Sequence, residues 1–457
     1  MSTIRLFVDF GSTFTKICAF DMEREELVAR AKTPSTVDTD VTIGLQNALD
    51  LIAAQVPIND DVIRNTCACS SAAGGLRVVC IGLTPELTTE AGRIAAYGAG
   101  AKIVGVFSYR LSPEDLAAIQ SLAPDVVLLS GGIDGGDKKS IIHNASLLAE
   151  TDDRVFNILV AGNKSAYDDV QSLLLPTGKN IIFAKNILPA LNRLQTEHIH
   201  TIIRDLFINH ITKSKGIDKA ASLIRGVLMP TPAAVLAAAA VAADGAEGEP
   251  GFGDLMIVDV GGATTDVYSV ADGFPSRNGV SLTGLPEPRI KRTVEGDLGL
   301  YHNLDTLTDA AKHSGVAGEA AETETLSAQL RQGFSIPTTA ETGRFHVALS
   351  RLAVKTAVER HCGSLLPLSG GRFAQKGKDL TNIPAIIGAG GPIVYSPDFS
   401  EVLSGALKDA EDVYSLKPCA PRFYKDDQYI LYAAGLMAAT EPLTALHLLK
   451  KYITAQS

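Results

Sequence analysis

One pattern occurs twice in the 457-residue chain, 250 residues apart, and it limits what the chain can fold into. The pattern is an apolar strand that ends on an aspartate, a turn of small and hydroxyl residues, and a second apolar strand. The copies align Asp9 with Asp259 and read FVDFGSTFTKICAF at 7–20 and IVDVGGATTDVYSV at 257–270. Each copy is typical of a β-hairpin. The repeat therefore predicts two related lobes that face one ligand.

Each turn is suited to hold a phosphate group. Glycine allows positive φ and lets backbone N–H groups approach a phosphate without a Cβ in the way. Asp9 and Asp259 suit a hydrated Mg²⁺, which favours one or two carboxylates with water and phosphates, and Lys16 adds a point charge for a phosphate. Two ordinary hairpins with glycine turns are the plainer interpretation. The candidate turn residues are Gly11, Ser12, Thr13, Thr15, Gly261, Gly262, Ala263, Thr264 and Thr265.

A third glycine-rich turn follows an apolar run in AIIGAGGP, residues 385–392. After two phosphate-binding hairpins, the backbone of Gly388, Gly390 and Gly391 would supply a flat surface for an adenine ring. The sequence has no G-x-x-x-x-G-K-[ST] loop, and GAGGP lacks the G-x-G-x-x-G spacing of a dinucleotide-binding turn. The three turns together favour a nucleotide site.

Composition places the chain among ordinary globular proteins, with 46% hydrophobic and 20% charged residues. A formal charge of −10, from 41 Lys and Arg against 51 Asp and Glu, disfavours nucleic-acid binding. The start of the chain has no signal-peptide pattern, and the longest apolar run, 233–243, reaches only about half of a membrane span. We expect a cytoplasmic protein with no nucleic-acid or membrane partner.

Between the hairpins, short β-branched runs alternate with helical patterns, as at 103–107 and 125–130. This alternation predicts βαβ units and a parallel sheet within an insertion at 85–225. The Gly/Glu/Pro-rich stretch 244–254 indicates a linker. Farther on, the sequence predicts helices at 304–361, a loop at 368–379 and a helix at 428–441. We expect a first lobe at 1–243, a second lobe at 255–427 and a C-terminal segment, 428–457, that returns toward the first lobe.

The ordered motifs resemble those of the actin, Hsp70 and sugar-kinase superfamily. Residues 9–13 match its first phosphate motif, 259–266 its second and 388–391 its adenosine motif. Pro230 to Ala234 is similar to the first connecting helix, and 428–441, with Gly435, to the second. Over its full length the chain also resembles the MutL-type accessory proteins of adenosylcobalamin-dependent glutamate mutase. The stretches that carry this resemblance are VDFGSTFTK, GLTPELTTEAGRIAAYGAGAKI, DVVLLSGGIDGGDK, AGNKSA, MPTPAAVL, KRTVEGDLG and GAGGPIVYSP.

The resemblance implies an α/β protein with two ribonuclease-H-like lobes, the actin-like ATPase fold, and an enlarged first lobe. It implies an accessory protein that binds and hydrolyses ATP with Mg²⁺ and promotes release of inactive cobalamin from a mutase, with glutamate mutase as the first candidate. Asp9 and Asp259 would organise Mg²⁺, and Lys16 would contact phosphate. The candidates that would orient the attacking water are Asp266, Glu295 and Asp297, although a polar loop with surface charges would also explain the last two.

Other candidate residues and functions stay open. The loop of Asp134, Gly135, Gly136 and Asp137 could bind an anion or the client, or form an irregular turn, and Lys164 and Arg77 are further candidates. One alternative function is a small-molecule kinase of the same fold, and another is a nucleotide-switched assembly protein. A third is a radical-dehydratase activator, which holds a metal cluster through cysteines; here only Cys67 and Cys69 lie close in sequence. The client enzyme, self-association and the choice between hydrolysis and nucleotide exchange also stay open.

Overall fold

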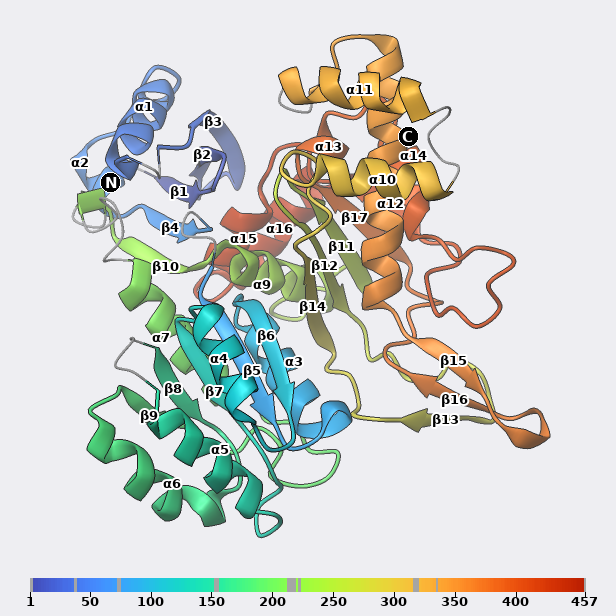
Figure 1. The fold of residues 1–457 in the computed structure, drawn as a ribbon. Helices are drawn as coiled ribbons and strands as arrows, with labels where there is room; N and C mark the ends of the chain where they lie inside the picture. Colours follow the sequence, from blue (N-terminus) through green and yellow to red (C-terminus); the bar gives the residue numbers. More distant parts are fainter. Residues whose placement is uncertain are drawn as a thin grey trace.

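Each repeated hairpin lies within a mixed sheet, and the two sheets share one strand order in the computed structural model (Figure 1). In each of these sheets the first three strands pair antiparallel, the fourth adds in parallel beside the first, and the fifth adds in parallel beside the fourth. This is the ribonuclease-H-like order that the resemblance implies, so the expected fold class is confirmed. The structure describes residues 3–36, 39–71, 75–151, 156–211, 219–220, 223–314, 320–333 and 336–455.

The first sheet contains the first hairpin. Its elements in chain order are β1 (Ile4–Phe10), β2 (Phe14–Asp21), β3 (Glu26–Pro34), α1 (Val41–Ala53), α2 (Asp60–Arg64), β4 (Cys67–Ser70) and β10 (Gly226–Pro230). The strand order is β10-β4-β1-β2-β3. Helix α1 begins after Asp40, whose carboxylate accepts a hydrogen bond from the Thr42 N–H and so caps the helix.

The second sheet contains the second hairpin, in the order β14-β12-β11-β17-β18-β19. Its strands are β11 (Leu255–Val260), β12 (Thr265–Val270), β14 (Ile290–Glu295), β17 (Ala385–Ala389), β18 (Arg422–Lys425) and β19 (Thr454–Ala455). The helices expected at 304–361 are present. The helices of this lobe are α10 (Leu304–Ser314), α11 (Ala320–Gln332), α12 (Ala340–His361), α13 (Gly391–Val394) and α14 (Phe399–Leu403).

A separate, fully parallel sheet is inserted between β4 and β10. Its strands are β5 (Arg77–Gly82), β6 (Lys102–Ser108), β7 (Val126–Leu129), β8 (Asn157–Val160) and β9 (Ile181–Phe183), in the order β6-β5-β7-β8-β9. All four pairings are parallel, as the βαβ alternation predicts, and the order is that of a flavodoxin-like doubly wound sheet. Its helices are α3 (Glu90–Gly98), α4 (Pro113–Ser121), α5 (Lys139–Ala149), α6 (Tyr167–Leu174) and α7 (Glu197–Ile211).

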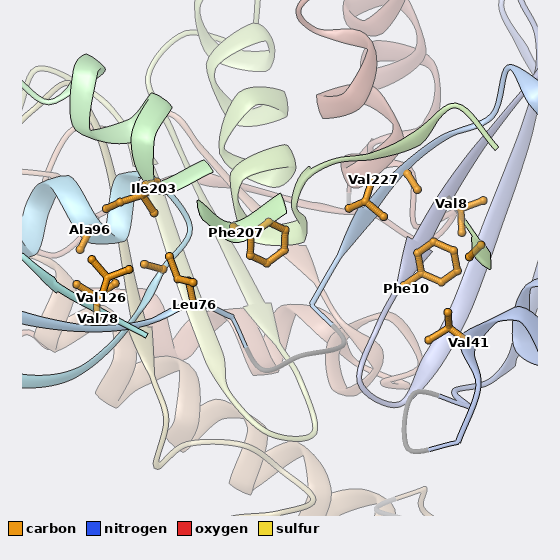
Figure 2. Packing of buried hydrophobic residues seen from close by; sticks show 14 of the residues in the cluster. Val8, Phe10, Val41, Leu76, Val78, Ala96, Val126, Ile203, Phe207 and Val227 are labelled. Carbon is orange, nitrogen blue, oxygen red and sulfur yellow. The ribbon is translucent and has the colours of Figure 1, made fainter. Parts of the chain in front are cut away.

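One apolar core joins the first sheet to the parallel sheet (Figure 2). Phe207 of α7 and Val227 of β10 lie between the residues of the two sheets. Because buried side chains continue from one sheet to the other, the inserted sheet packs against the first lobe and is not merely tethered to it. Other members of this core are Val8, Phe10, Val41, Leu76, Val78, Ala96, Val126 and Ile203.

Three helices share a core with both mixed sheets: α9 (Thr231–Asp244), α15 (Leu431–Met437) and α16 (Pro442–Tyr452). Their buried side chains cluster with Phe7 of the first sheet and Ile257 of the second. Within the described ranges, no helix combines the length and apolar character needed to cross a bilayer. The C-terminal segment contacts both lobes, since β19 pairs with β18 of the second sheet and the Tyr432 hydroxyl donates to the Phe7 carbonyl of the first.

Helices α9 and α15 approach most closely at Gly435. A Cβ on Gly435 would lie 1.8 Å from the carbonyl oxygen of Ala234, a backbone atom that cannot turn away.

The prediction of a helix at 428–441 is wrong in its bounds, because α15 begins only at Leu431 and ends at Met437. Asp426 accepts hydrogen bonds from the Ile430 and Leu431 N–H groups and so fixes this start.

We expect Gly435→Ala to destabilise the protein by about 1–3 kcal/mol, because the added methyl group overlaps the α9 backbone. Gly343→Ala is the matched control. Gly343 lies in α12 with its nearest would-be contact at 4.0 Å, so alanine there should gain helix propensity and cost nothing. Urea unfolding of both variants measures the difference. Equal midpoints for the two variants would contradict a close crossing at Gly435.

A small fourth sheet projects from the second lobe, away from the other three sheets (Figure 1). Its strands are β13 (Val280–Thr283), β15 (Ser364–Pro367) and β16 (Phe373–Lys376), in the order β13-β16-β15. The loop expected at 368–379 is therefore wrong for β16. The run Phe-Ala-Gln-Lys is too short for a periodic signal, and it becomes a strand by pairing with β13, which lies far away in the sequence.

One histidine ties helix α16 to two distant segments. His447 Nδ1 lies 2.6 Å from Glu25 Oε2, and His447 Nε2 lies 2.6 Å from Glu249 Oε2. Glu25 is in the turn before β3, and Glu249 is in the stretch 244–254 expected to be a linker. The hydrogen bonds to Glu249 and Glu25 raise the pKa of His447 above its ordinary value. The protonated imidazolium therefore joins three parts of the chain.

This pair of contacts should make stability depend on pH. Since the pKa of His447 is raised in the folded state, its stabilising effect is complete below the unfolded value of about 6.5 and is lost as pH rises through the folded value. We expect His447→Gln to lower the melting temperature at pH 6 by more than at pH 9. Lys450→Met, which removes another partner of Glu249, is a control whose effect should be similar at both values. A pH-independent effect of His447→Gln would contradict this role.

Candidate functional site

The first hairpin turns tightly at Gly11. The Gly11 N–H donates to the Phe14 carbonyl at 3.0 Å, and a Cβ on Gly11 would lie 2.6 Å from that oxygen. Ser12 and Thr13, the next two residues, are exposed. The turn is thus narrow and presents its hydroxyl residues to solvent, as a phosphate-binding turn requires.

Asp9, at the end of β1, is only 3% exposed and has two close partners. Its Oδ1 accepts a hydrogen bond from the Thr231 hydroxyl at 2.6 Å, and Lys16 Nζ lies 3.3 Å from its Oδ2. Burial alone would lower the pKa of Lys16, but the charges of Asp9 and Asp259 outweigh burial and raise it. Lys16 is therefore held as a cation within reach of the aspartates of both repeats.

The second hairpin repeats this geometry. The Gly261 N–H donates to the Thr264 carbonyl at 2.9 Å, which closes the turn as Gly11 and Phe14 do in the first repeat. Asn303, just before α10, donates to the Ala263 carbonyl at 2.9 Å and supports the turn from outside. The turn residues are partly exposed: Gly261, Gly262, Ala263 and Thr264.

Asp259 lies where the second hairpin meets the adenosine motif. Burial, followed by the nearby charge of Asp266, raises the pKa of Asp259 to about 7. Gly390 has φ 85°, and a Cβ there would lie 2.1 Å from the Val260 carbonyl oxygen and 2.6 Å from Asp259 Oδ1. Only glycine fits this contact, so the third turn packs directly on the second hairpin. Gly388 is buried in β17, and Gly391 is partly exposed at the start of α13.

Two residues that sequence reasoning missed complete this region. Burial raises the pKa of Asp426 to about 6, and the charge of Lys16 acts against this rise. Lys16 Nζ also lies 5.1 Å from the ring centroid of Tyr429, a non-glycine residue with φ 57°. The one signal for Asp426 in the sequence is its place directly after a short strand, near a strand end as Asp9 and Asp259 are, and this signal is weak alone.

Asp266 follows the second turn and is buried in an ion pair. Arg292 Nε and Nη2 donate to its Oδ1 at 2.9 and 2.6 Å, and the Thr264 hydroxyl donates to its Oδ2 at 2.9 Å. Arg292 also donates to the carbonyls of Tyr97 and Ala101, at the end of α3. Asp266 thereby connects the second turn to the inserted sheet.

Glu295 and Asp297 lie beside the second hairpin and share one partner. Arg360 of α12 donates to Glu295 Oε2 at 2.6 Å and to Asp297 at 2.8 and 3.0 Å. The hydrogen bonds from Arg360 lower the pKa of Asp297. Glu295 pairs in register with Thr265, so it is the closer of the two to the turn.

The loop after β7, with Asp134, Gly135, Gly136 and Asp137, is fixed by hydrogen bonds to neighbouring segments of the inserted sheet. Asn163 accepts a hydrogen bond from the Gly135 N–H and donates to the carbonyls of Gly136 and Asp137. Asp134 accepts hydrogen bonds from the Lys164 N–H and the Asn186 side chain. These contacts account for an irregular turn without a bound anion.

The other two candidates also have local partners. Lys164 Nζ lies 3.8 Å from Asp134 Oδ2, and its side chain is exposed. Arg77 donates to the carbonyls of Leu122 and Ala123, at the end of α4. Neither side chain lies in the two hairpins.

Cys67 and Cys69 lie in the buried strand β4, with exposed fractions of 5% and 0%. Cys69 Sγ is 3.7 Å from Asp9 Oδ1, and burial raises the pKa of both thiols. They serve as packing residues behind the first hairpin, which does not favour the radical-dehydratase activator among the alternative functions.

The residues present fit Mg²⁺ with a nucleotide. Among the described residues, no group of three or more His, Cys, Asp or Glu side chains is arranged to hold a metal by itself. Two carboxylates, one of them with a raised pKa, form instead the partial set that Mg²⁺ takes when phosphates and water fill its other positions.

Two ribonuclease-H-like sheets, with a hairpin in each and a glycine turn packed on the second, define a protein of the actin, Hsp70 and sugar-kinase class. The chain belongs to the MutL family, because the family model described as MutL protein matches residues 5–453. Protein MutL of Clostridium tetanomorphum is 42% identical over 456 residues, which cover 98% of each chain.

The solved structures to which the chain is similar are more distant in sequence. A glycerol dehydratase reactivase is 10% identical, with 95% of this chain and 99% of that chain covered and a TM-score of 0.35. Plasmodium falciparum glycerol kinase with ADP is 9% identical, with 98% and 92% covered and a TM-score of 0.35. Scores this low carry no argument, so the class rests on strand order and the family on the sequence match.

Proposed function

We propose that the chain is an ATP-hydrolysing accessory protein that reactivates an adenosylcobalamin-dependent mutase. One observation carries the nucleotide part of this proposal: Asp9 and Lys16 of one repeat lie within electrostatic reach of Asp259 of the other, beside Gly390 of the third turn. When residues of both lobes bind the phosphates of one nucleotide, the arrangement of the lobes can depend on whether the nucleotide is bound. The family membership supports the accessory role.

In this proposal, each part of the site has one task. Gly11, Ser12 and Thr13 bind phosphate oxygens from the first lobe, and Gly261, Gly262, Ala263 and Thr264 bind them from the second. Lys16 neutralises phosphate charge. The backbone of Gly388, Gly390 and Gly391 supports the adenine. Mg²⁺, held by Asp9 and Asp259, supplies charge neutralisation at the phosphates when it is bound.

The hydrolytic water needs an acceptor at the second hairpin. Because both oxygens of Asp266 are already bonded, we assign it to holding the Thr264 hydroxyl and, through Arg292, the hairpin itself. Glu295 is the better candidate to orient the water, and Asp297 keeps Arg360 in place beside it. The overall reaction converts ATP and water to ADP and phosphate.

The client that we propose is glutamate mutase, and the work is the release of inactive cobalamin so that fresh coenzyme can enter. Closure of the two lobes on ATP would act on the inserted sheet through Arg292 of β14, which donates to the carbonyls of Tyr97 and Ala101. We place the protein in the cytoplasm with its client, and we leave self-association open.

The direct test is recovery of glutamate mutase activity after inactivation with hydroxocobalamin. The mutase is incubated with adenosylcobalamin and this protein, with ATP, with ADP or without nucleotide. We expect recovery only with ATP, and none with Asp9→Ala. Asp168→Ala is a control outside the hairpins, at an exposed residue of α6, and should recover activity normally. Recovery that is indifferent to ATP and to Asp9→Ala would overturn the proposal.

A second measurement, the dependence of ADP release on added compounds, distinguishes this proposal from a small-molecule kinase of the same fold. Release of ADP should rise with added mutase and should not rise with sugars or small organic acids. Dependence on such a small molecule would favour the kinase.

A further inference from the structure

The small sheet that projects from the second lobe has no evident task in the proposed reaction. We define the arm as residues 274–284 and 364–376, which contain β13, β15 and β16. It extends away from the three large sheets (Figure 1). Its role must therefore be sought on its surface.

The arm carries four of the large apolar side chains that the protein exposes. Scattered single apolar residues are normal on a protein surface, but a group on one projection indicates a contact site. Leu282 of β13 and Leu366 of β15 are exposed on opposite edge strands. The large apolar side chains exposed on the arm are Phe274 (62%), Leu282 (45%), Leu366 (42%) and Leu368 (46%).

The two edges of this sheet differ. The outer edge of β15 is covered, since the Leu365 N–H donates to the Tyr414 carbonyl at 2.8 Å. In the part of the chain that the structure describes, no strand pairs with the outer edge of β13. Proteins usually protect such an edge with a charge, a proline or a bulge. β13 reads Val-Ser-Leu-Thr and pairs with β16 without a register shift, so it has none of these and is protected only by its length of four residues.

The charges of the arm have one sign. Its charged residues are Arg277, Arg372 and Lys376, all exposed, and neither of its two segments contains Asp or Glu. The whole chain has a formal charge of −10, so this local excess of cations is unusual for it. Pairing of β13 with the same strand of a second copy would bring two sets of three cations together. The charges thus disfavour self-pairing and favour an acidic partner.

We infer that the arm is a docking surface for an extended segment of another polypeptide, one in which apolar and acidic residues alternate. The segment adds to the free edge of β13 as a further strand. Its backbone pairs with β13, and its apolar side chains pack beside Leu282 on one face of the sheet. Its carboxylates lie on the opposite face, which carries Lys376 beside Thr283, and are attracted to Arg277, Arg372 and Lys376. This inference requires neither the nucleotide nor a particular client.

The test uses the full-length protein and a library of random twelve-residue peptides displayed on phage. We expect enriched peptides to alternate apolar residues with Asp or Glu. A synthetic copy of an enriched peptide should bind the Leu282→Lys variant at least about tenfold more weakly, because a lysine on the edge blocks strand addition. Leu51→Lys is the matched control: Leu51 is 47% exposed on α1, against 45% for Leu282, and its replacement should leave binding unchanged.

Two further measurements locate the contact. Arg277→Glu/Arg372→Glu should weaken binding, and added salt should do the same to the parent protein. Hydrogen exchange should slow within residues 279–284 when the peptide binds. The inference is overturned if no peptide is enriched, if the enriched peptides are basic, or if Leu282→Lys binds them as well as Leu51→Lys does. A dimer of the parent protein in light scattering that Leu282→Lys makes monomeric would assign the edge to a second copy and would equally overturn it.

Discussion

An Asp259→Asn variant should be more stable than the parent protein without nucleotide and yet hydrolyse ATP at least about 100-fold more slowly. Burial and the charge of Asp266 raise the pKa of Asp259 to about 7, so ionising this carboxylate opposes folding. An asparagine of the same shape carries no charge and removes that cost. It also removes a proposed ligand of Mg²⁺. Opposite effects on stability and on activity are what we expect of a residue kept for binding.

The raised pKa of Asp259 determines the sign of the stability difference between Asp259→Asn and the parent protein, and the pH range in which it develops. Below the ordinary value of 3.8 the carboxyl is protonated in both states, so aspartate and asparagine should behave alike. Between pH 4 and 7 the unfolded state ionises first, and the parent protein loses stability relative to the variant. Above about pH 8 the difference should be constant at about 4 kcal/mol, since the shift spans about three pKa units and each corresponds to about 1.4 kcal/mol.

Urea unfolding at pH 4.5 and pH 8, in the presence of a chelator, measures this difference. Asp379→Asn is a control of opposite sign. Hydrogen bonds from Thr381 and Ser276 outweigh the effect of burial and lower the pKa of Asp379, so its loss should destabilise the protein at pH 8. With Mg²⁺ and ATP present, the parent protein should gain stability and Asp259→Asn should not. A variant that is less stable than the parent at pH 8 would show that Asp259 is a structural residue.

The fold could be predicted from the sequence wherever a pattern is local. The two hairpins are visible because a buried strand, an aspartate and a glycine turn lie within about 14 residues of one another. The parallel sheet could be predicted from the alternation of short strands and helices. By contrast, β16 and β13 are short strands stabilised by pairing with each other across about 90 residues of sequence, and no local pattern indicates them.

The candidate site likewise contains residues that a local motif predicts and residues that only the fold brings to it. Gly11, Gly261 and Gly390 could be predicted, and the structure gives each a steric reason, because a Cβ would meet the backbone. Asp426 approaches the same region from a segment that carries no motif of its own, and Thr231, although it lies in the segment likened to the first connecting helix, gives no sign in the sequence that its hydroxyl bonds Asp9. Residues such as these are brought to a site by the fold, so they become evident only when the strands and helices are placed.

Arg292 could not be assigned from the sequence either, and its removal should have the largest effect on stability. We expect Arg292→Met to destabilise the protein by about 3–5 kcal/mol, because it leaves the buried carboxylate of Asp266 without its ion partner. The carbonyls of Tyr97 and Ala101 would also lose a donor. Arg289→Met is the matched control: Arg289 pairs with three carboxylates but is 37% exposed, so its loss should cost less than about 1 kcal/mol.

A double variant separates the cost of an unpaired buried charge from the cost of lost packing. If an unpaired buried charge causes the loss, Asp266→Leu/Arg292→Met should recover much of the stability, since apolar residues of similar volume can replace a buried ion pair. Chemical unfolding of the two single variants and the double variant completes the cycle. Hydrogen exchange at the end of α3 should rise in Arg292→Met and stay raised in the double variant, because neither restores the donor to Tyr97 and Ala101. An additive cycle would mean that Asp266 is satisfied without Arg292, and that the link between the second hairpin and the inserted sheet does not depend on this pair.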